Sequence, residues 1–295
     1  MSLTNKIDFA VVFKVVNANP NGDPLNGNRP RTTYDGLGEL SDVCLKRKIR
    51  NRLMEAGKAI FVQSDDNKCD KHQNLKSRAD EALSAEKNLN GKISKACKTW
   101  FDVRAFGQLF PFKAAVKKGQ KGDGEGAGED KGVSIGIRGP VSIQPAFSLS
   151  KIDVTSDQIT KSTSLEGDGV NRQPDQMGMK HRVDRGIYVF CGSMNPQLAV
   201  KTGFSDADAE AIKAVLPRLF ENDASSARPE GSMEVLKVVW WHHNCPAGQA
   251  SSAKVHRSLK VNDTDDVSAL LSFESGKGPK DCTGNWPKPE IIDWA

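Results

Sequence analysis

Hydrophobic side chains alternate along residues 7–16, and this alternation constrains the fold more than any other feature of the sequence. The apolar residues on one side of the run are Ile7, Phe9, Val11, Phe13 and Val15. A period of two predicts a β-strand that buries one face against a core. Strand-like runs follow at 133–149, 186–195 and 233–243, and Gly139 with Pro140 indicates a kink or bulge in the first of them. The chain is therefore expected to build a sheet from strands that are distant in sequence.

Helical signals lie between these strands. Ser41 and Asp42 can open a helix over 41–56 that Gly57 ends, because glycine readily adopts the left-handed conformation of a helix terminus. Ser205, with Asp208 three residues later, resembles a capping box at the start of a helix over 205–220. The side chains expected to face the core are Leu45, Ile49, Leu53 and Ala56 in the first helix, and Ile212, Val215, Leu216, Leu219 and Phe220 in the second.

The remaining segments complete a fold class. Residues 58–63 look like another strand, and 64–98 is polar, charged and nearly free of Gly and Pro, which indicates a helical insertion. Residues 117–132 contain no large apolar side chain and are expected to form a mobile loop, and 251–295 form an irregular tail. The order strand, helix, strand, strand, helix, strand predicts an α+β protein. Its core would be ferredoxin-like, of the RNA-recognition-motif type, with one face of the sheet open.

Composition narrows the class of protein. The chain has 295 residues, enough for a hydrophobic core that needs no disulfides, and its six cysteines form no C-x-x-C pair. No window approaches the ~20 apolar residues of a transmembrane helix, and the first residues lack the features of a signal peptide, so a cytoplasmic location is expected. A net charge of +5 does not by itself identify a nucleic-acid-binding protein. The local clustering of cations matters more.

One such cluster lies on the first predicted helix. Its outward positions carry cations with no acid among them, and these are Lys46, Arg47, Lys48, Arg50 and Arg52. Like charges four residues apart repel each other and disfavour the helix unless an anion relieves them. The cluster therefore indicates a surface for phosphate groups, and the alternative is an ordinary solvated helix face.

Several motifs, taken in order, resemble one known family. They are NPNGDP after the first strand, the basic helix, DVRAFG, SIGIRGPVSIQPAFSLS and MKHRVDRGIYVFCGSMNP. The chain resembles the subtype I-C member of the Cas-seven family, the backbone subunit of the type I CRISPR surveillance complex, Cascade. The resemblance implies a non-catalytic protein that polymerises head to tail along CRISPR RNA and displays the guide for pairing with target DNA. The other implied partners are further copies of the chain, the processing or cap subunit and the large subunit. No cofactor, metal or membrane is implied.

The same resemblance divides the chain into the parts of a right hand. The palm is expected in 1–63, in 99–149 around the loop at 117–132, and in 186–250. The helical insertion 64–98 would form a finger, 150–185 a thumb-like arm, and 251–295 a C-terminal extension.

RNA contacts are implied at residues that match the family's guide-binding segments. They are Asn21, Gly22, Arg29 and Arg31 after the first strand, Lys46, Arg47 and Arg50 on the helix, and Met177, Met179, Lys180, His181 and Arg182 in the arm. Because guide sequences vary, such a protein must hold sugar and phosphate, with apolar wedges only where a base is displaced. Each group has a structural alternative. The glycine serves a turn, the methionines pack against a neighbour, and the arm cations are simply exposed.

The sequence predicts neither a metal site nor a nucleotide-binding loop. His243 and Cys245 face one side of a strand and His242 the other, so at most two of the three converge on a metal. Gly22 and Gly27 do not belong to a G-x-x-x-x-G-K-[ST] loop, so ATP binding is not predicted.

The sequence leaves two nuclease alternatives open. A metal-independent CRISPR RNA-processing endonuclease could use His181, Lys180 and Tyr188 as acid and base near a 2′-hydroxyl. Type III relatives cut bound target RNA with a loop aspartate, for which Asp23 or Asp35 would be the candidate. A loop aspartate is more often a turn residue or helix cap.

Overall fold

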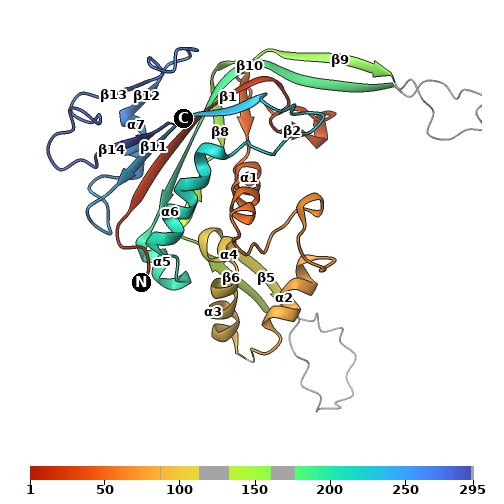
Figure 1. The fold of residues 1–295 in the computed structure, drawn as a ribbon, viewed down its shortest axis with the longest axis vertical. Helices are drawn as coiled ribbons and strands as arrows, with labels where there is room; N and C mark the ends of the chain where they lie inside the picture. The colour runs from red at the N-terminus through yellow and green to blue at the C-terminus, as the bar shows by residue number, and fades with distance from the viewer. Residues whose placement is uncertain (87, 113–132, 161–176, 294–295) are drawn as a thin grey trace, which may run out of the picture.

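An eight-stranded antiparallel sheet forms the centre of the computed structural model, which describes residues 1–86, 88–112, 133–160 and 177–293 (Figure 1). The strand order is β14, β11, β1, β10, β8 and β4, and β7 and β9 also pair with β10. The bounds are β1 (Ile7–Ala18), β4 (Leu37–Leu40), β7 (Val141–Ile143), β8 (Ala146–Lys151), β9 (Val154–Thr160), β10 (Met177–Met194), β11 (Met233–His242) and β14 (Pro289–Ile292). The described residues also contain seven α-helices.

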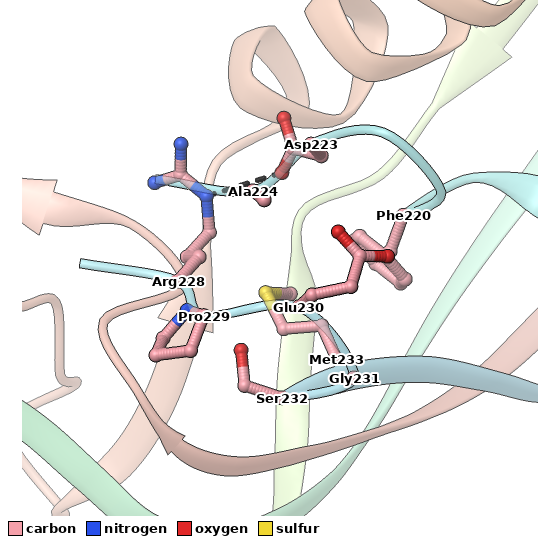
Figure 2. A pocket seen from close by; sticks show the side chains of 9 residues that line it. All are labelled: Phe220, Asp223, Ala224, Arg228, Pro229, Glu230, Gly231, Ser232 and Met233. Carbon is pink, nitrogen blue, oxygen red and sulfur yellow. Dashed lines mark hydrogen bonds and ion pairs between the residues drawn. The ribbon is translucent and has the colours of Figure 1, made fainter. Parts of the chain in front are cut away.

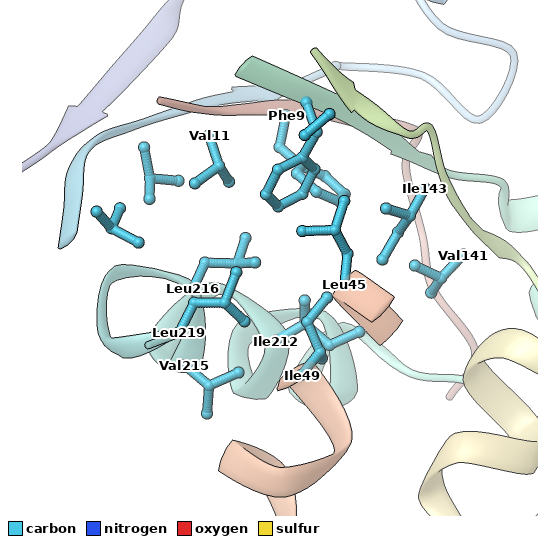
Figure 3. Packing of buried hydrophobic residues seen from close by; sticks show 14 of the residues in the cluster. Phe9, Val11, Leu45, Ile49, Val141, Ile143, Ile212, Val215, Leu216 and Leu219 are labelled. Atoms are coloured by element: carbon cyan, nitrogen blue, oxygen red, sulfur yellow. The ribbon is translucent and has the colours of Figure 1, made fainter. Parts of the chain in front are cut away.

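Helices cover one face of this sheet. They are α1 (Asp42–Glu55), α5 (Pro196–Thr202) and α6 (Asp206–Val215), and the 3-10 turn η3 (Leu216–Arg218) follows α6. Figure 3 shows Leu45 and Ile49 of α1 and Ile212 of α6 in one core with Phe9 and Val11 of β1. This packing confirms the predicted stripes, although the last residue of the first stripe, Ala56, is exposed.

The predicted helix boundaries are also found. Ser41 accepts a hydrogen bond from the Cys44 backbone N–H, and Gly57 has a φ of 76°. Ser205 and Asp208 form the expected capping box. The α-helix predicted over 205–220 ends at Val215 and continues as η3, because Pro217 cannot donate the backbone hydrogen bond of a helix interior.

The second face of the sheet is covered, which contradicts the prediction of an open face. Residues 251–295 are not simply irregular, because they form α7 (Ser252–Ser258), β12 (Leu259–Val261), β13 (Leu271–Phe273) and β14. Val255 and Leu259 pack against Ala10, Val239 and Trp241 of the sheet, and all five side chains are buried. Strand β1 is therefore buried on both faces rather than on one.

A separate hydrophobic cluster supports the lobe formed by α2 (Leu75–Leu83), α3 (Leu89–Thr99), α4 (Phe101–Phe106), β5 (Gly107–Phe112) and β6 (Val133–Arg138). Residues 58–63 join this lobe to α1 but form no strand, so that prediction is wrong. The reason is local: the backbone N–H groups of Phe61 and Val62 donate to the carboxylate of Asp102, at 2.7 and 3.1 Å. These donors are therefore not available to a β-ladder.

The run over 133–149 forms three strands in two sheets rather than one kinked strand. It breaks at Gly139 and Pro140, as predicted, since β6 pairs with β5 and β7 with β10. Gly139 is needed there because a Cβ would lie 2.3 Å from the carbonyl oxygen of Ala105.

An extended hairpin leaves the sheet as an arm (Figure 1). It consists of β9 and the first half of β10, which pair antiparallel from Val154 with Val183 to Thr160 with Met177. The loop predicted at 117–132 and the arm segment 161–176 lie outside the described residues.

None of the described helices is long and apolar enough to cross a bilayer.

Candidate nucleic-acid interface

The loop after β1 is tied to the start of α1. Asn21 Oδ1 accepts hydrogen bonds from the backbone N–H and the hydroxyl of Ser41, both at 3.0 Å. A Cβ at Gly22 would lie 2.0 Å from Asn28 Oδ1 and 3.1 Å from the Asn28 carbonyl oxygen, so glycine lets the Asn28 side chain pack against this strand. Both predicted residues therefore have structural roles in holding the loop that carries β2 (Gly22–Asp23), the 3-10 turn η1 (Pro24–Asn26) and β3 (Arg29–Pro30).

The aspartate of this loop is a turn and cap residue. Asp23 Oδ1 accepts a hydrogen bond from the Leu25 N–H at 3.2 Å and lies 3.5 Å from an Arg31 amino group. Asp35 is exposed. The contacts of Asp23 are those of a turn and cap residue rather than those of an RNA-cutting site.

The loop and the arm meet through one serine hydroxyl. Arg29 Nη1 donates to Ser156 Oγ at 3.1 Å, and His181 Nδ1 lies 2.8 Å from the same oxygen. Ser156 and His181 are register partners on β9 and β10. A hydroxyl that accepts from Arg29 can donate to His181, so the three groups form one chain from the loop to the arm. The structure therefore brings two predicted RNA-binding residues together from segments about 150 residues apart.

The two faces of the arm differ in chemistry. Side chains two apart on a strand share a face, so Met177, Met179 and His181 lie together, and Lys180 and Arg182 point the other way. Met177 is 68% exposed and Met179 is 55% exposed. Arg182 forms ion pairs with Asp157 and, at 3.8 Å, with Asp184. Lys180 is exposed and has no ion pair with any described residue.

The cations of α1 are all paired within the chain, so the prediction that they are unopposed is wrong. Each contacts a carboxylate: Lys46 with Asp42 at 2.9 Å, Arg47 with Asp66 at 3.1 Å, Lys48 with Asp223, Arg50 with Asp102 at 2.9 Å, and Arg52 with Glu55. Only two of these acids belong to the helix, and the other three come from distant segments. Folding thus supplies the counter-charges that the local sequence lacks.

Burial removes two of these cations from any ligand surface. Lys48 and Arg52 are 4% and 7% exposed. Burial lowers the pKa of Lys48, and the nearby Asp223 carboxylate partly offsets that effect. Burial likewise raises the pKa of the Cys44 thiol, which lies on the same helix.

The proposed acid–base group of a processing endonuclease is not assembled. Lys180 and His181 are neighbours on an extended strand, so their side chains point to opposite faces. Tyr188 is fully buried, and its ring stacks on Phe13 with centroids 5.3 Å apart. Burial raises the Tyr188 pKa, which disfavours a role in proton transfer.

His243, a possible metal ligand by sequence, belongs to a buried polar cluster. His243 Nε2 lies 2.9 Å from Asp8 Oδ2, and His243 Nδ1 accepts the Gln249 N–H at 2.9 Å. Both ring nitrogens are therefore used inside the protein.

One basic residue near this interface was missed by the sequence analysis. Arg228 Nε donates to Asp223 Oδ2 at 3.1 Å, beside α1. The neighbouring Ala227 carbonyl accepts a hydrogen bond from the Asn19 N–H at 2.8 Å. This bond places the loop before β11 against the loop after β1. A single arginine before a proline in a polar segment has no pattern from which this position could be predicted.

Comparison with known proteins identifies the family. A family model described as CRISPR-associated protein Cas7 matches residues 5–277. The chain belongs to the Cas7 family. A Cas7 protein of Haloferax volcanii is 27% identical over 245 residues, which cover 81% of this chain and 71% of that protein.

Solved structures similar to this Cas7-family chain include two described as CRISPR RNA-guided surveillance complexes. A chain of the first, in a pre-nicking state, has a TM-score of 0.47 at 14% identity, covering 90% of this chain and 85% of its own length. A chain of the second has a TM-score of 0.43 at 16% identity, with coverages of 90% and 79%.

Proposed function

We propose that this Cas7-family chain is a CRISPR RNA-binding backbone subunit, several copies of which lie head to tail along the guide in a type I surveillance complex of subtype I-C. The observation that carries the proposal is the junction of loop and arm at Arg29, Ser156 and His181. It places a guanidinium beside a strand face with exposed Met177 and Met179. A cation and an apolar wedge on one surface are what a protein needs to hold a nucleic-acid backbone and displace a base.

The strand order supports a ferredoxin-like core of the RNA-recognition-motif type as the palm. If β1, β8, β10 and β11 are numbered one to four in chain order, their order across the sheet is four, one, three, two, and all neighbours are antiparallel. Along the chain, helix α1 lies between β1 and β8, and helix α6 lies between β10 and β11. This is the arrangement of two interleaved βαβ units. The palm would then be 1–63, 99–149 and 186–250.

The remaining parts of the hand are assigned by position. The finger would be 64–98, the thumb the arm at 150–185, and the extension 251–295, which covers the second face of the sheet. Head-to-tail assembly would place the arm of one copy beside the next, where Met177 and Met179 either separate bases or pack on that neighbour. Target DNA would be bound through the displayed guide.

Guide phosphates are the proposed ligands of Arg29, Arg31 and Lys180, with Asn21 and Gly22 shaping the loop that presents the first two. On α1, Arg47 is the most accessible predicted contact, since it and its partner Asp66 are 55% and 70% exposed. An exposed ion pair contributes only ~0–1 kcal/mol, so a phosphate can replace the carboxylate at little cost. We propose a binding role and no catalytic role, because Tyr188 is buried, Lys180 and His181 point to opposite faces of the arm, and Asp23 is a turn and cap residue.

Native mass spectrometry of the full chain co-expressed with a CRISPR RNA tests this function. The expected result is a multimer on one RNA, with a copy number that rises when the guide is lengthened. A variant lacking residues 152–182 should keep the circular dichroism of a folded protein but lose ordered multimers. An intact chain that binds no RNA, or that stays monomeric on it, contradicts the proposal.

A further inference from the structure

Residues 219–232 connect η3 to β11 and lie where three other segments meet. The loop is fixed to β1 and its following loop by backbone hydrogen bonds from Val16 N–H to the Ser232 carbonyl and from Asn19 N–H to the Ala227 carbonyl, both 2.8 Å. Asp223 fixes it to α1 through the ion pair with Lys48. Arg228 therefore occupies a defined position beside the basic helix.

Two cations at this corner share one carboxylate. Asp223 contacts both Lys48 and Arg228, whereas Arg47 pairs with a different acid, Asp66. Lys48 and Arg228 therefore divide a single negative charge between them. A phosphodiester, which carries one negative charge, can serve Arg228 as a second anionic partner.

The guanidinium of Arg228 is only partly used by the protein. Its Nε contacts Asp223, while its two terminal amino groups have no partner among the described residues (Figure 2). Figure 2 shows these two nitrogens pointing away from the cavity lined by Phe220 and Met233. That cavity measures only about 10 Å³, which is close to the space of a single water molecule. A ligand of Arg228 must therefore bind on the outer surface.

Arg47 and Arg228 both keep hydrogen-bond donors for a ligand. Among the described residues, Arg47 uses one terminal amino group for Asp66, and Arg228 uses only Nε for Asp223. Asp66 is open to solvent, so its ion pair with Arg47 is weak. Both guanidinium groups can therefore donate to an incoming anion.

We propose that Arg228 and Arg47 form a phosphodiester-binding site for the RNA backbone on this corner of the molecule. The planar fork of a guanidinium matches a phosphate group in two parallel hydrogen bonds, and each arginine has donors available for such a pair. The inference rests on the proposed function and adds to it a contact contributed by the loop before β11.

Substitution of Arg228 can be compared with a control in the preceding turn, η3. Arg218 forms an ion pair through Nε with Glu221 at 2.7 Å, and Arg228→Gln and Arg218→Gln change the net charge equally. Loss of one single-strand phosphate contact lowers the slope of log K against log salt by about 0.7, or about fourfold in affinity at 0.15 M salt. We expect this loss for Arg228→Gln and not for Arg218→Gln, and Arg228→Lys should retain most of the slope.

A second measurement needs no variant. Phenylglyoxal modifies accessible arginines, and mass spectrometry of the wild-type chain with and without CRISPR RNA reports which are protected. Protection of Arg228 and Arg47 but not of Arg218 supports the site. Equal slopes for the two glutamine variants, or an unprotected Arg228 in an RNA-bound chain, overturn this inference and leave the proposed function standing. A wild-type chain that binds no RNA overturns both.

Discussion

Helix α1 and the surface between loop and arm both carry clustered basic side chains, yet they use them differently. On α1 every cation contacts a carboxylate of the same chain. At the loop–arm surface, Arg29 contacts a hydroxyl, and Lys180 has no ion pair with any described residue. Cations that are adjacent in sequence therefore mark where positive charge lies, but acids from elsewhere in the fold decide whether it is available to a ligand.

The acids that pair with α1 also hold the molecule together. Asp102 is 1% exposed and links Arg50 of α1 to the backbone N–H groups of Phe61 and Val62. Removing one partner of a buried pair leaves the other charge uncompensated, which is costly. The buried pairs of the basic helix thus stabilise the fold, whereas the exposed Arg47 and the cations at the loop–arm surface remain accessible.

The largest expected effect is on folding. Replacing Asp102 by Ala should lower the free energy of unfolding by about 3–5 kcal/mol, because it strands Arg50 and two backbone donors. Replacing Asp157, whose pair with Arg182 in the arm is exposed, should lower it by less than about 1 kcal/mol. Urea unfolding of the two variants beside the wild type measures the difference. Similar losses in both would contradict the contrast between the two regions.

Elements with local signals were predictable from sequence. The alternation along β1 and the caps at Ser41 and Ser205 depend on neighbours a few residues away, and each is found where it was predicted. Elements that depend on partners distant in sequence could not be predicted. Strand β14 forms because Pro289–Ile292 pairs with β11, and no periodicity within the tail indicates that.

The candidate site divides in the same way. The arm and the loop were predicted as separate RNA-binding segments, but the hydroxyl of Ser156 that joins them has no sequence signal. One of the ion pairs of α1 had a clue in the sequence. Asp102 is a lone acid inside an aromatic run, and such an acid is seldom buried without a cation. The partners Asp66 and Asp223 offered no comparable signal.

A smaller effect, on RNA affinity, sharpens the comparison with two matched lysines. Lys46 is paired with Asp42, whereas Lys180 is not paired with a described residue. Lys180→Gln should reduce affinity about fourfold at 0.15 M salt and the salt slope by about 0.7, since one phosphate contact is lost. Lys46→Gln should change both by less than half as much, because its charge is already neutralised. Salt titrations of RNA binding by fluorescence anisotropy would decide, and a larger loss at Lys46 would reverse the conclusion about α1.

The smallest expected effect is on the pH dependence of stability. It comes from titratable groups that contact each other at the second face of the sheet. His256 of α7 lies 3.6 Å from Asp8 and 3.2 Å from the Gly192 carbonyl. Burial lowers the pKa of His256 below its ordinary 6.5, and the Asp8 carboxylate only partly offsets this. Burial raises the pKa of Asp8, but hydrogen bonds from His243 and Ser252, with the charges of Lys6 and His256, bring it below 3.8.

Both shifts predict a protein that is less stable in acid. A group with a lowered pKa in the folded state binds its proton more tightly when unfolded, so its stabilising contribution is present above the unfolded pKa and is lost as pH falls. Stability should therefore decline as pH drops below about 6.5 through His256, and again below about 3.8 through Asp8. Urea midpoints measured between pH 8 and pH 5 report the first step, and His256→Gln should flatten it. An unchanged midpoint across that range would mean that α7 is not held to the sheet by a neutral, buried histidine.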